Sequence, residues 1–81
     1  MSRYSLFNQK DKLILSYGYD EDQGYYYELW EALYPEDNEA RLIESSSVLA
    51  TNLNTGDLVK ILDQWDAPRE HLLAISIGMQ F

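Results

Sequence analysis

Residues 13–30 read LILSYGYDEDQGYYYELW, and this stretch has the pattern of two β-strands joined by a short polar turn. In its first half, apolar and aromatic side chains recur at every second position, which places them on one face of a strand. They are Leu13, Leu15, Tyr17 and Tyr19. Asp20–Gly24 is a charged connection that ends in glycine and suits a hairpin loop. The second strand, Tyr25–Trp30, directs Tyr25, Tyr27 and Leu29 to one face and Tyr26, Glu28 and Trp30 to the other.

The chain on either side of this hairpin extends the pattern. On the N-terminal side, Arg3–Phe7 alternates loosely and predicts a third strand, joined to the hairpin by the polar turn Asn8–Asp11. On the C-terminal side the apolar period changes to that of a helix. A cap at Asn54 or Thr55 precedes the stripe Leu58, Ile61, Leu62 and Trp65.

A second C-terminal helix is expected directly after the first. Asp66 is expected to cap it, with Pro68 in its first turn and Gly78 at its end. Its apolar stripe is Leu72, Ile75 and Met79, widened by Leu73 and Ile77. The segment from Pro35 to Ser47 has no clear period and is expected to be irregular: Pro35–Glu39 as a loop or the acidic first turn of a short helix, and Arg41–Glu44 as its continuation or as a short strand. The sequence therefore predicts one α+β domain over residues 1–81, a small antiparallel three-stranded meander packed on one face by two C-terminal helices.

Composition excludes several kinds of function. The chain has 81 residues, no cysteine and a net charge of −8, with 14 acidic and 6 basic residues. Without cysteine there is no disulfide, thiolate catalysis or cysteine-based zinc site. No segment approaches the ~18 consecutive apolar residues of a membrane span, and the N-terminus lacks the apolar core of a signal peptide, so we expect a cytoplasmic protein without membrane contact. The negative charge argues against direct nucleic-acid binding.

Acidic and aromatic residues are concentrated in residues 13–40, which hold eight carboxylates, six of the seven tyrosines and no lysine or arginine. Aromatic anchors surrounded by carboxylates are suited to binding a basic protein surface. The candidate partner-binding residues are Asp20, Glu21, Asp22, Tyr26, Glu28, Trp30, Glu31, Glu36, Asp37 and Glu39. In the alternative interpretation, the tyrosines and leucines of one face pack on the helices and the carboxylates are merely solvated.

Catalytic and metal sites are not indicated. Asp20–Asp22 could hold a cation, but the loop lacks the calcium-loop pattern of glycine and glutamate. His71 is the only histidine and has no catalytic partner at a suitable spacing, so we expect it on a helix surface. The two C-terminal helices superficially suggest a DNA-binding helix-turn-helix, but the second helix lacks the basic or amide residues of a DNA reader. We expect no enzyme activity, no metal and no cofactor.

In size, charge and lack of cysteine, the chain resembles the small acidic proteins that phages and plasmids use against host nucleic-acid machinery, among them anti-restriction and anti-CRISPR proteins. This likeness is one of composition and transfers no functional residue. The leading hypothesis is an inhibitor that occupies a basic, nucleic-acid-binding surface of a host protein. The alternatives are an antitoxin or accessory subunit that caps a basic partner, and a structural protein that self-associates, for which a homodimer is one form.

Overall fold

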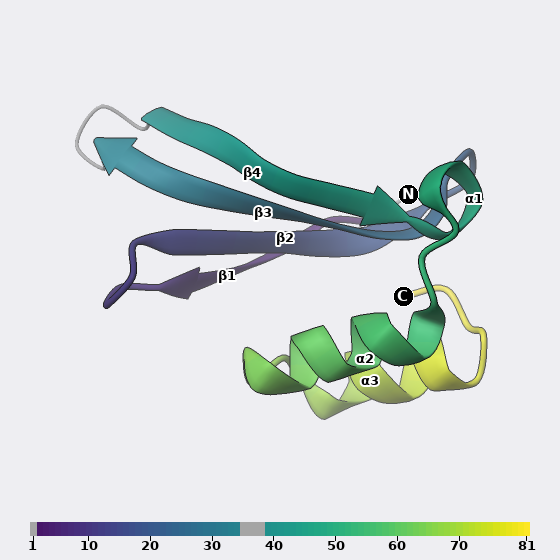
Figure 1. Ribbon diagram of the computed structural model, residues 1–81. Helices are drawn as coiled ribbons and strands as arrows, with labels where there is room; N and C mark the ends of the chain where they lie inside the picture. Colours follow the sequence, from purple (N-terminus) through teal and green to yellow (C-terminus); the bar gives the residue numbers. More distant parts are fainter. Residues whose placement is uncertain (1, 35–38) are drawn as a thin grey trace.

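The computed structural model describes residues 2–34 and 39–81 and shows an α+β fold. Within these residues, four strands form one antiparallel sheet in the order β1-β2-β3-β4, and three helices follow them in the chain (Figure 1). The elements are β1 (Tyr4–Asn8), β2 (Leu13–Asp20), β3 (Gly24–Tyr34), β4 (Glu39–Ser47), α1 (Val48–Thr51), α2 (Thr55–Gln64) and α3 (Arg69–Ser76). Among the described residues, no helix combines the length and the apolar character needed to cross a membrane.

The three strands of the expected meander are present as β1, β2 and β3, and the sheet has a fourth strand, β4, beyond the expected three. The segment expected to be irregular is ordered over Glu39–Ser47: it forms β4, which pairs with β3 and contains the short strand considered for Arg41–Glu44, and α1 follows it; residues 35–38 lie outside the described residues. The register between the two strands shifts between Leu29 and Trp30, so β4 carries an irregularity beside its Leu42–Glu44 segment. Such a bulge breaks the period-two alternation by which a strand is recognised in a sequence.

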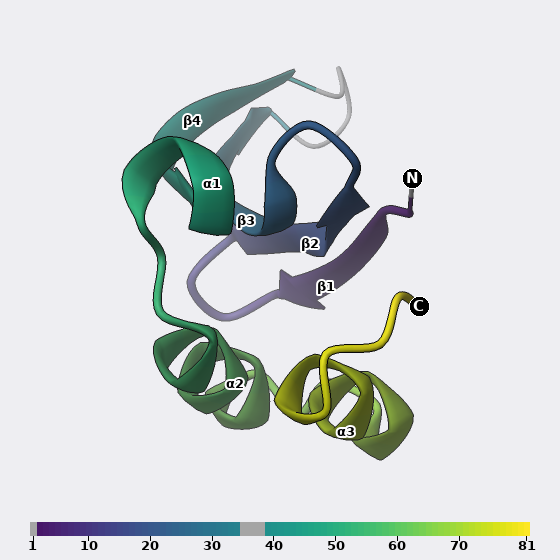
Figure 2. The same ribbon diagram turned by 90° about the vertical axis from the view of Figure 1, so that its right-hand side faces the viewer.

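The helices α2 and α3 lie side by side against one face of the sheet, as Figure 2 shows, and neither covers the opposite face. Side chains from both layers form the core. Leu15 and Tyr17 of β2 are 1% exposed, and Leu58 and Leu62 of α2 are fully buried. Ile75 of α3 joins them, and Tyr25 and Tyr27 face the same core, as the alternation of β3 predicts. Hereafter this covered side of the sheet is the helix face, and the other side is the open face.

The helix ends depart in part from the expectation. The Asn54 side chain caps α2 as predicted, accepting hydrogen bonds from the backbone of Gly56 and Asp57. Asp66 does not cap α3: it has a left-handed backbone (φ 57°) and terminates α2, with its N–H bonded to the Asp63 carbonyl.

The C-terminal apolar stripe is also shorter than expected. Because α3 ends at Ser76 and Gly78 reverses the chain with a φ of 78°, Met79 lies outside the helix and is exposed. Leu73 and Ile77, which were expected to widen the stripe, are likewise exposed. Of the predicted stripe, Leu72 and Ile75 pack against the core.

Candidate protein-binding surface

A row of apolar side chains crosses the open face of the sheet. Strand pairing sets Phe7 opposite Ile14, Ile14 opposite Trp30, and Trp30 opposite Leu42. These four residues are called the apolar row. Phe7 is 53% exposed and Leu42 is 45% exposed, while Ile14 and Trp30 are half-buried between them. Ile43, beside the irregularity in β4, is 47% exposed and adds to the apolar surface at this edge. A contiguous apolar strip on an uncovered sheet face is typical of an interaction site.

Beside the apolar row lies a second row made of small polar residues. Ser5 pairs with Ser16, Ser16 with Glu28, and Glu28 with Ser45. The Ser5 and Ser16 hydroxyls are 3.1 Å apart and hydrogen-bonded. Glu28 is the one carboxylate within this row. It accepts a hydrogen bond from the Arg3 guanidinium at 2.7 Å and a long one from the Trp30 indole at 3.4 Å.

Carboxylates gather beyond this polar row, at the β2–β3 turn. Asp20 accepts a hydrogen bond from the Asp22 backbone at 2.7 Å, which closes the turn. Glu21 and Asp22 are exposed. Asp20 and Glu28 line a shallow hollow of about 130 Å³ together with Arg3, Gln23 and Tyr26. We call Asp20, Glu21, Asp22 and Glu28 the acidic end of the open face. Arg3 borders this acidic end and pairs with Glu28.

Tyr26 lies on the open face, as predicted, but it is not an exposed anchor. Its cross-strand partner is Gly18, and its ring is only 9% exposed. The Tyr26 hydroxyl donates a hydrogen bond to the Ser2 carbonyl at 2.9 Å. A Cβ at Gly18 would lie 2.1 Å from that same carbonyl oxygen. The absence of a side chain at position 18 thus lets the N-terminal segment approach the sheet, and Tyr26 holds that segment in place.

The remaining candidate residues are not all brought to this surface. Glu31 projects from the helix face of β3 and accepts a hydrogen bond from Arg41 at 3.1 Å. Glu39 is the first residue of β4. Glu36 and Asp37 lie outside the described residues. The structure therefore unites Asp20, Glu21, Asp22, Glu28 and Trp30 on or beside the open face, and it separates Glu31 from them.

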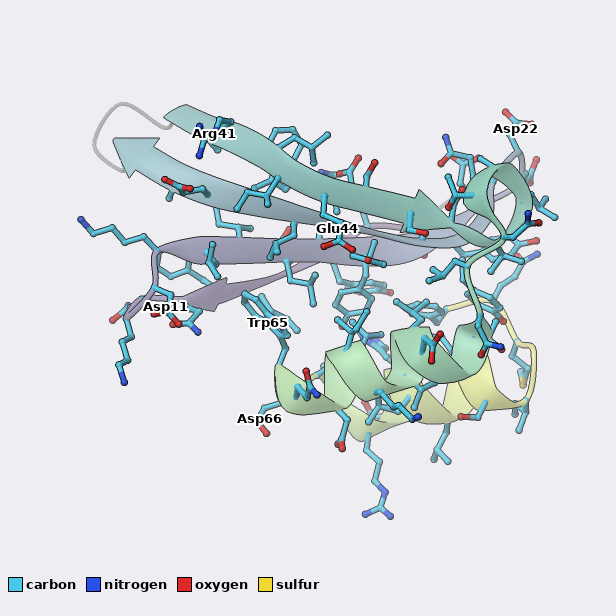
Figure 3. All side chains as sticks on the ribbon, in the orientation of Figure 1. Asp11, Asp22, Arg41, Glu44, Trp65 and Asp66 are labelled. Carbon is cyan, nitrogen blue, oxygen red and sulfur yellow. The ribbon has the colours of Figure 1, made fainter. Side chains whose placement is uncertain are left out.

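The tyrosines of the helix face connect the two layers. The Tyr17 hydroxyl is 2.6 Å from Nδ1 of His71, and the Tyr25 hydroxyl donates to the Met79 carbonyl at 2.7 Å. The Tyr27 hydroxyl donates to the carboxylate of Glu44, which Figure 3 shows on the helix side of β4. For these three rings, packing against the helices explains the high tyrosine content without a partner.

His71 belongs to this aromatic layer, so the expectation of a histidine on the helix surface is wrong. Its ring centroid is 4.3 Å from that of Tyr4 and 4.9 Å from that of Phe81. Phe81 also stacks on Tyr4, at 5.6 Å. No local signal around position 71 reveals this role, because the contacts come from residues at both ends of the chain.

Four tyrosine hydroxyls in and around the sheet have pKa values above the ordinary value of a tyrosine. Burial is the main cause for Tyr17, Tyr25, Tyr26 and Tyr27. The largest effect is on Tyr27, where burial, the hydrogen bond to Glu44 and the negative charge of Glu44 raise the pKa to about 12. These four hydroxyls stay protonated at neutral pH, and those of Tyr25, Tyr26 and Tyr27 donate hydrogen bonds.

A groove of about 560 Å³ separates the β1–β2 turn from the end of α2. Figure 3 shows Trp65 rising from α2 toward the sheet, with Asp11 at the turn and Asp66 below. Asp11 is already bonded to the Asn8 side chain. Across residues 2–34 and 39–81, no three His, Asp or Glu side chains are grouped to hold a metal ion.

Comparison with protein-family models, with curated proteins and with solved structures finds no match for this chain.

Proposed function

We propose that this chain is a non-catalytic binding protein whose open face docks on a basic protein surface that otherwise binds nucleic acid. In this role it acts as an inhibitor, as the small acidic proteins of phages and plasmids do. The observation that carries the proposal is the position of the apolar row and the acidic end on one uncovered sheet face.

The apolar row provides the part of the surface that is desolvated on binding. Trp30 lies near its middle and combines a large apolar area with an indole N–H. Phe7 and Leu42 on either side are about half-exposed, so a partner can still cover them. Central aromatic residues flanked by apolar neighbours dominate the affinity of many interfaces.

The acidic end provides selection for a basic partner. Its carboxylates meet lysine and arginine side chains that would otherwise contact phosphates, and the net charge of −8 steers such a partner toward the chain. Glu28 already binds Arg3 at 2.7 Å, a geometry that an incoming guanidinium can share or replace. An antitoxin or accessory subunit would use the same surface, and the identity of the bound protein distinguishes these roles.

The test has two steps. The immobilised protein is first used to capture basic proteins from a cell lysate at low and at high salt. A captured protein is then purified, and its binding to a nucleic-acid fragment is measured by gel shift with and without this chain. We expect this chain to abolish the shift. The variant Leu42→Lys should no longer inhibit, and neither should the triple variant in which Asp20, Glu21 and Asp22 are all replaced by lysine.

Leu73→Lys is the matched control, because Leu73 is 57% exposed on α3, on the opposite side of the molecule. It should inhibit as the parent does. Undiminished inhibition by all open-face variants, or captured proteins that bind without affecting nucleic-acid binding, would contradict the proposal.

A further inference from the structure

The strand β1 lies at one edge of the sheet and pairs only with β2 within the described residues. Residues that exchange hydrogen bonds with a neighbouring strand alternate with residues that do not. The Ser2 N–H donates to the Tyr19 carbonyl, which sets this alternation for the pair. The N–H and C=O groups of Arg3, Ser5 and Phe7 consequently point away from β2, toward the open edge.

The two edges of the sheet differ in how they resist pairing with another strand. The β4 edge carries the charged residues Arg41 and Glu44 and the irregularity near Ile43, all of which hinder strand addition. The β1 edge reads YSLFN over residues 4–8, without a charge, a proline or a bulge, and the preceding Arg3 directs its guanidinium inward to Glu28. The β1 edge is therefore the one open to a further strand.

We propose that two copies of this chain pair through β1 in antiparallel orientation, with Ser5 opposite Ser5 of the second copy. This register places Arg3 opposite Phe7 of the second copy, and Phe7 opposite its Arg3. Every outward N–H and C=O of these three residues then has a backbone partner. The arrangement is two-fold symmetric, so one surface serves both copies, and it joins the sheets into one.

Side chains of the two copies match in this register. On the open face, each Arg3 lies opposite Phe7 of the second copy while its guanidinium stays bonded to Glu28, so no cation has to be desolvated between the two edge strands. On the helix face, each Tyr4, 38% exposed, lies opposite Leu6 of the second copy. A slip of one residue would direct these side chains to the wrong faces, so the register is well specified.

The charges of the turns also favour the second copy as occupant. The β1–β2 turn contains Lys10 and Lys12 on either side of Asp11, a net charge of +1, and lies at the opposite end of β2 from the acidic Asp20–Asp22. Antiparallel pairing brings the basic turn of one copy to the end of the sheet that holds the acidic turn of the other. This opposes the repulsion expected between two chains that each carry a charge of −8.

Substitutions at Ser5 test the pairing directly, because the symmetry axis places this exposed side chain opposite its own copy. Self-association is measured by sedimentation over a concentration series. Ser5→Lys and Ser5→Glu should each weaken the dimer by roughly tenfold or more, since like charges then face one another. An equimolar mixture of the two variants should dimerise again. Ser5→Ala, which removes only the hydroxyl bonded to Ser16, should behave as the parent does.

Leu42→Lys separates this pairing from self-association through the apolar row. It places a charge on the open face far from the β1 edge and should leave the dimer intact. The proposal is overturned if the parent sediments as a monomer throughout, if the mixed Ser5 variants fail to dimerise, or if Leu42→Lys is the change that dissociates the parent dimer. Circular dichroism confirms that each variant is folded. This inference is independent of the proposed binding to a basic partner.

Discussion

Tyr27 makes the stability of this protein depend on pH in the alkaline range. Its hydroxyl is buried beside Glu44 and has a pKa of about 12 in the folded chain, against about 10 when exposed. Because the folded state holds the proton more tightly, the associated stability is fully present below pH 10 and is lost as the pH rises to about 12. A shift of about two units corresponds to ~3 kcal/mol at most.

The perturbation is Tyr27→Phe, and the assay is denaturant unfolding of parent and variant at a series of pH values from 8 to 12. At pH 8 the variant should be less stable by about 1–2 kcal/mol, because it lacks the hydrogen bond to Glu44. At pH 12 the parent should have lost about 2 kcal/mol relative to the variant, so the two stability curves approach and cross near the end of this range. Tyr17, Tyr25 and Tyr26 also have raised pKa values, but they are common to both proteins and cancel in the difference.

Glu44→Gln is the matched control. It retains an acceptor for the hydroxyl and removes the negative charge, so the Tyr27 pKa should fall but stay above the ordinary value, since burial is its main cause. Tyrosinate absorbance follows the titration directly. Parallel stability curves for parent and Tyr27→Phe between pH 8 and 12 would refute the reasoning.

Three further predictions concern packing, backbone approach and charge. Leu62→Ala should lower the free energy of unfolding by ~2–5 kcal/mol because Leu62 is fully buried. Leu73→Ala, at an exposed position, should change it by less than ~0.5 kcal/mol. Equal melting temperatures for the two variants would show that α2 is not packed as described. Gly18→Ala should displace the N-terminal segment, because the new Cβ would lie 2.1 Å from the Ser2 carbonyl oxygen. Hydrogen exchange at the Ser2 N–H, which is bonded to the Tyr19 carbonyl, should then become faster. An unchanged exchange rate at that N–H would contradict this contact. The isolated protein should not shift duplex DNA in a gel at physiological salt, and salt-sensitive binding at micromolar concentration would undermine the electrostatic argument.

Local patterns in the sequence were sufficient for the central hairpin and the C-terminal helix pair. The period-two recurrence of Leu15 and Tyr17 identifies β2, and the stripe that contains Leu58 and Leu62 identifies α2. Asn54 was recognisable as a cap because its side chain bonds to the backbone two and three residues ahead. Each of these features depends on neighbours within one or two turns of chain, and the physical preference is therefore present in the local sequence.

The candidate site could be predicted from the sequence only in part. The sequence placed Trp30 and Glu28 on the face opposite Tyr25 and Tyr27, because side chains alternate along a strand. It could not show that Tyr26 covers Gly18 and binds the Ser2 carbonyl, since that contact joins three segments. The same alternation, continued one residue further, puts Glu31 on the helix face; Glu31 was grouped with the other carboxylates because the predicted strand ended at Trp30, whereas β3 runs to Tyr34.

The tertiary structure alone determined β4, the role of His71 and the apolar row. β4 lacks a clear alternation and is stabilised by hydrogen bonds to β3, and the irregularity opposite Leu29 and Trp30 hides its period. His71 meets Tyr17 across 54 positions of sequence. The apolar row exists because the registers of the three strand pairs set one apolar residue of each of the four strands side by side. Local periodicity determines which face of an element is apolar, whereas the pairing of distant segments determines which of those faces remain open.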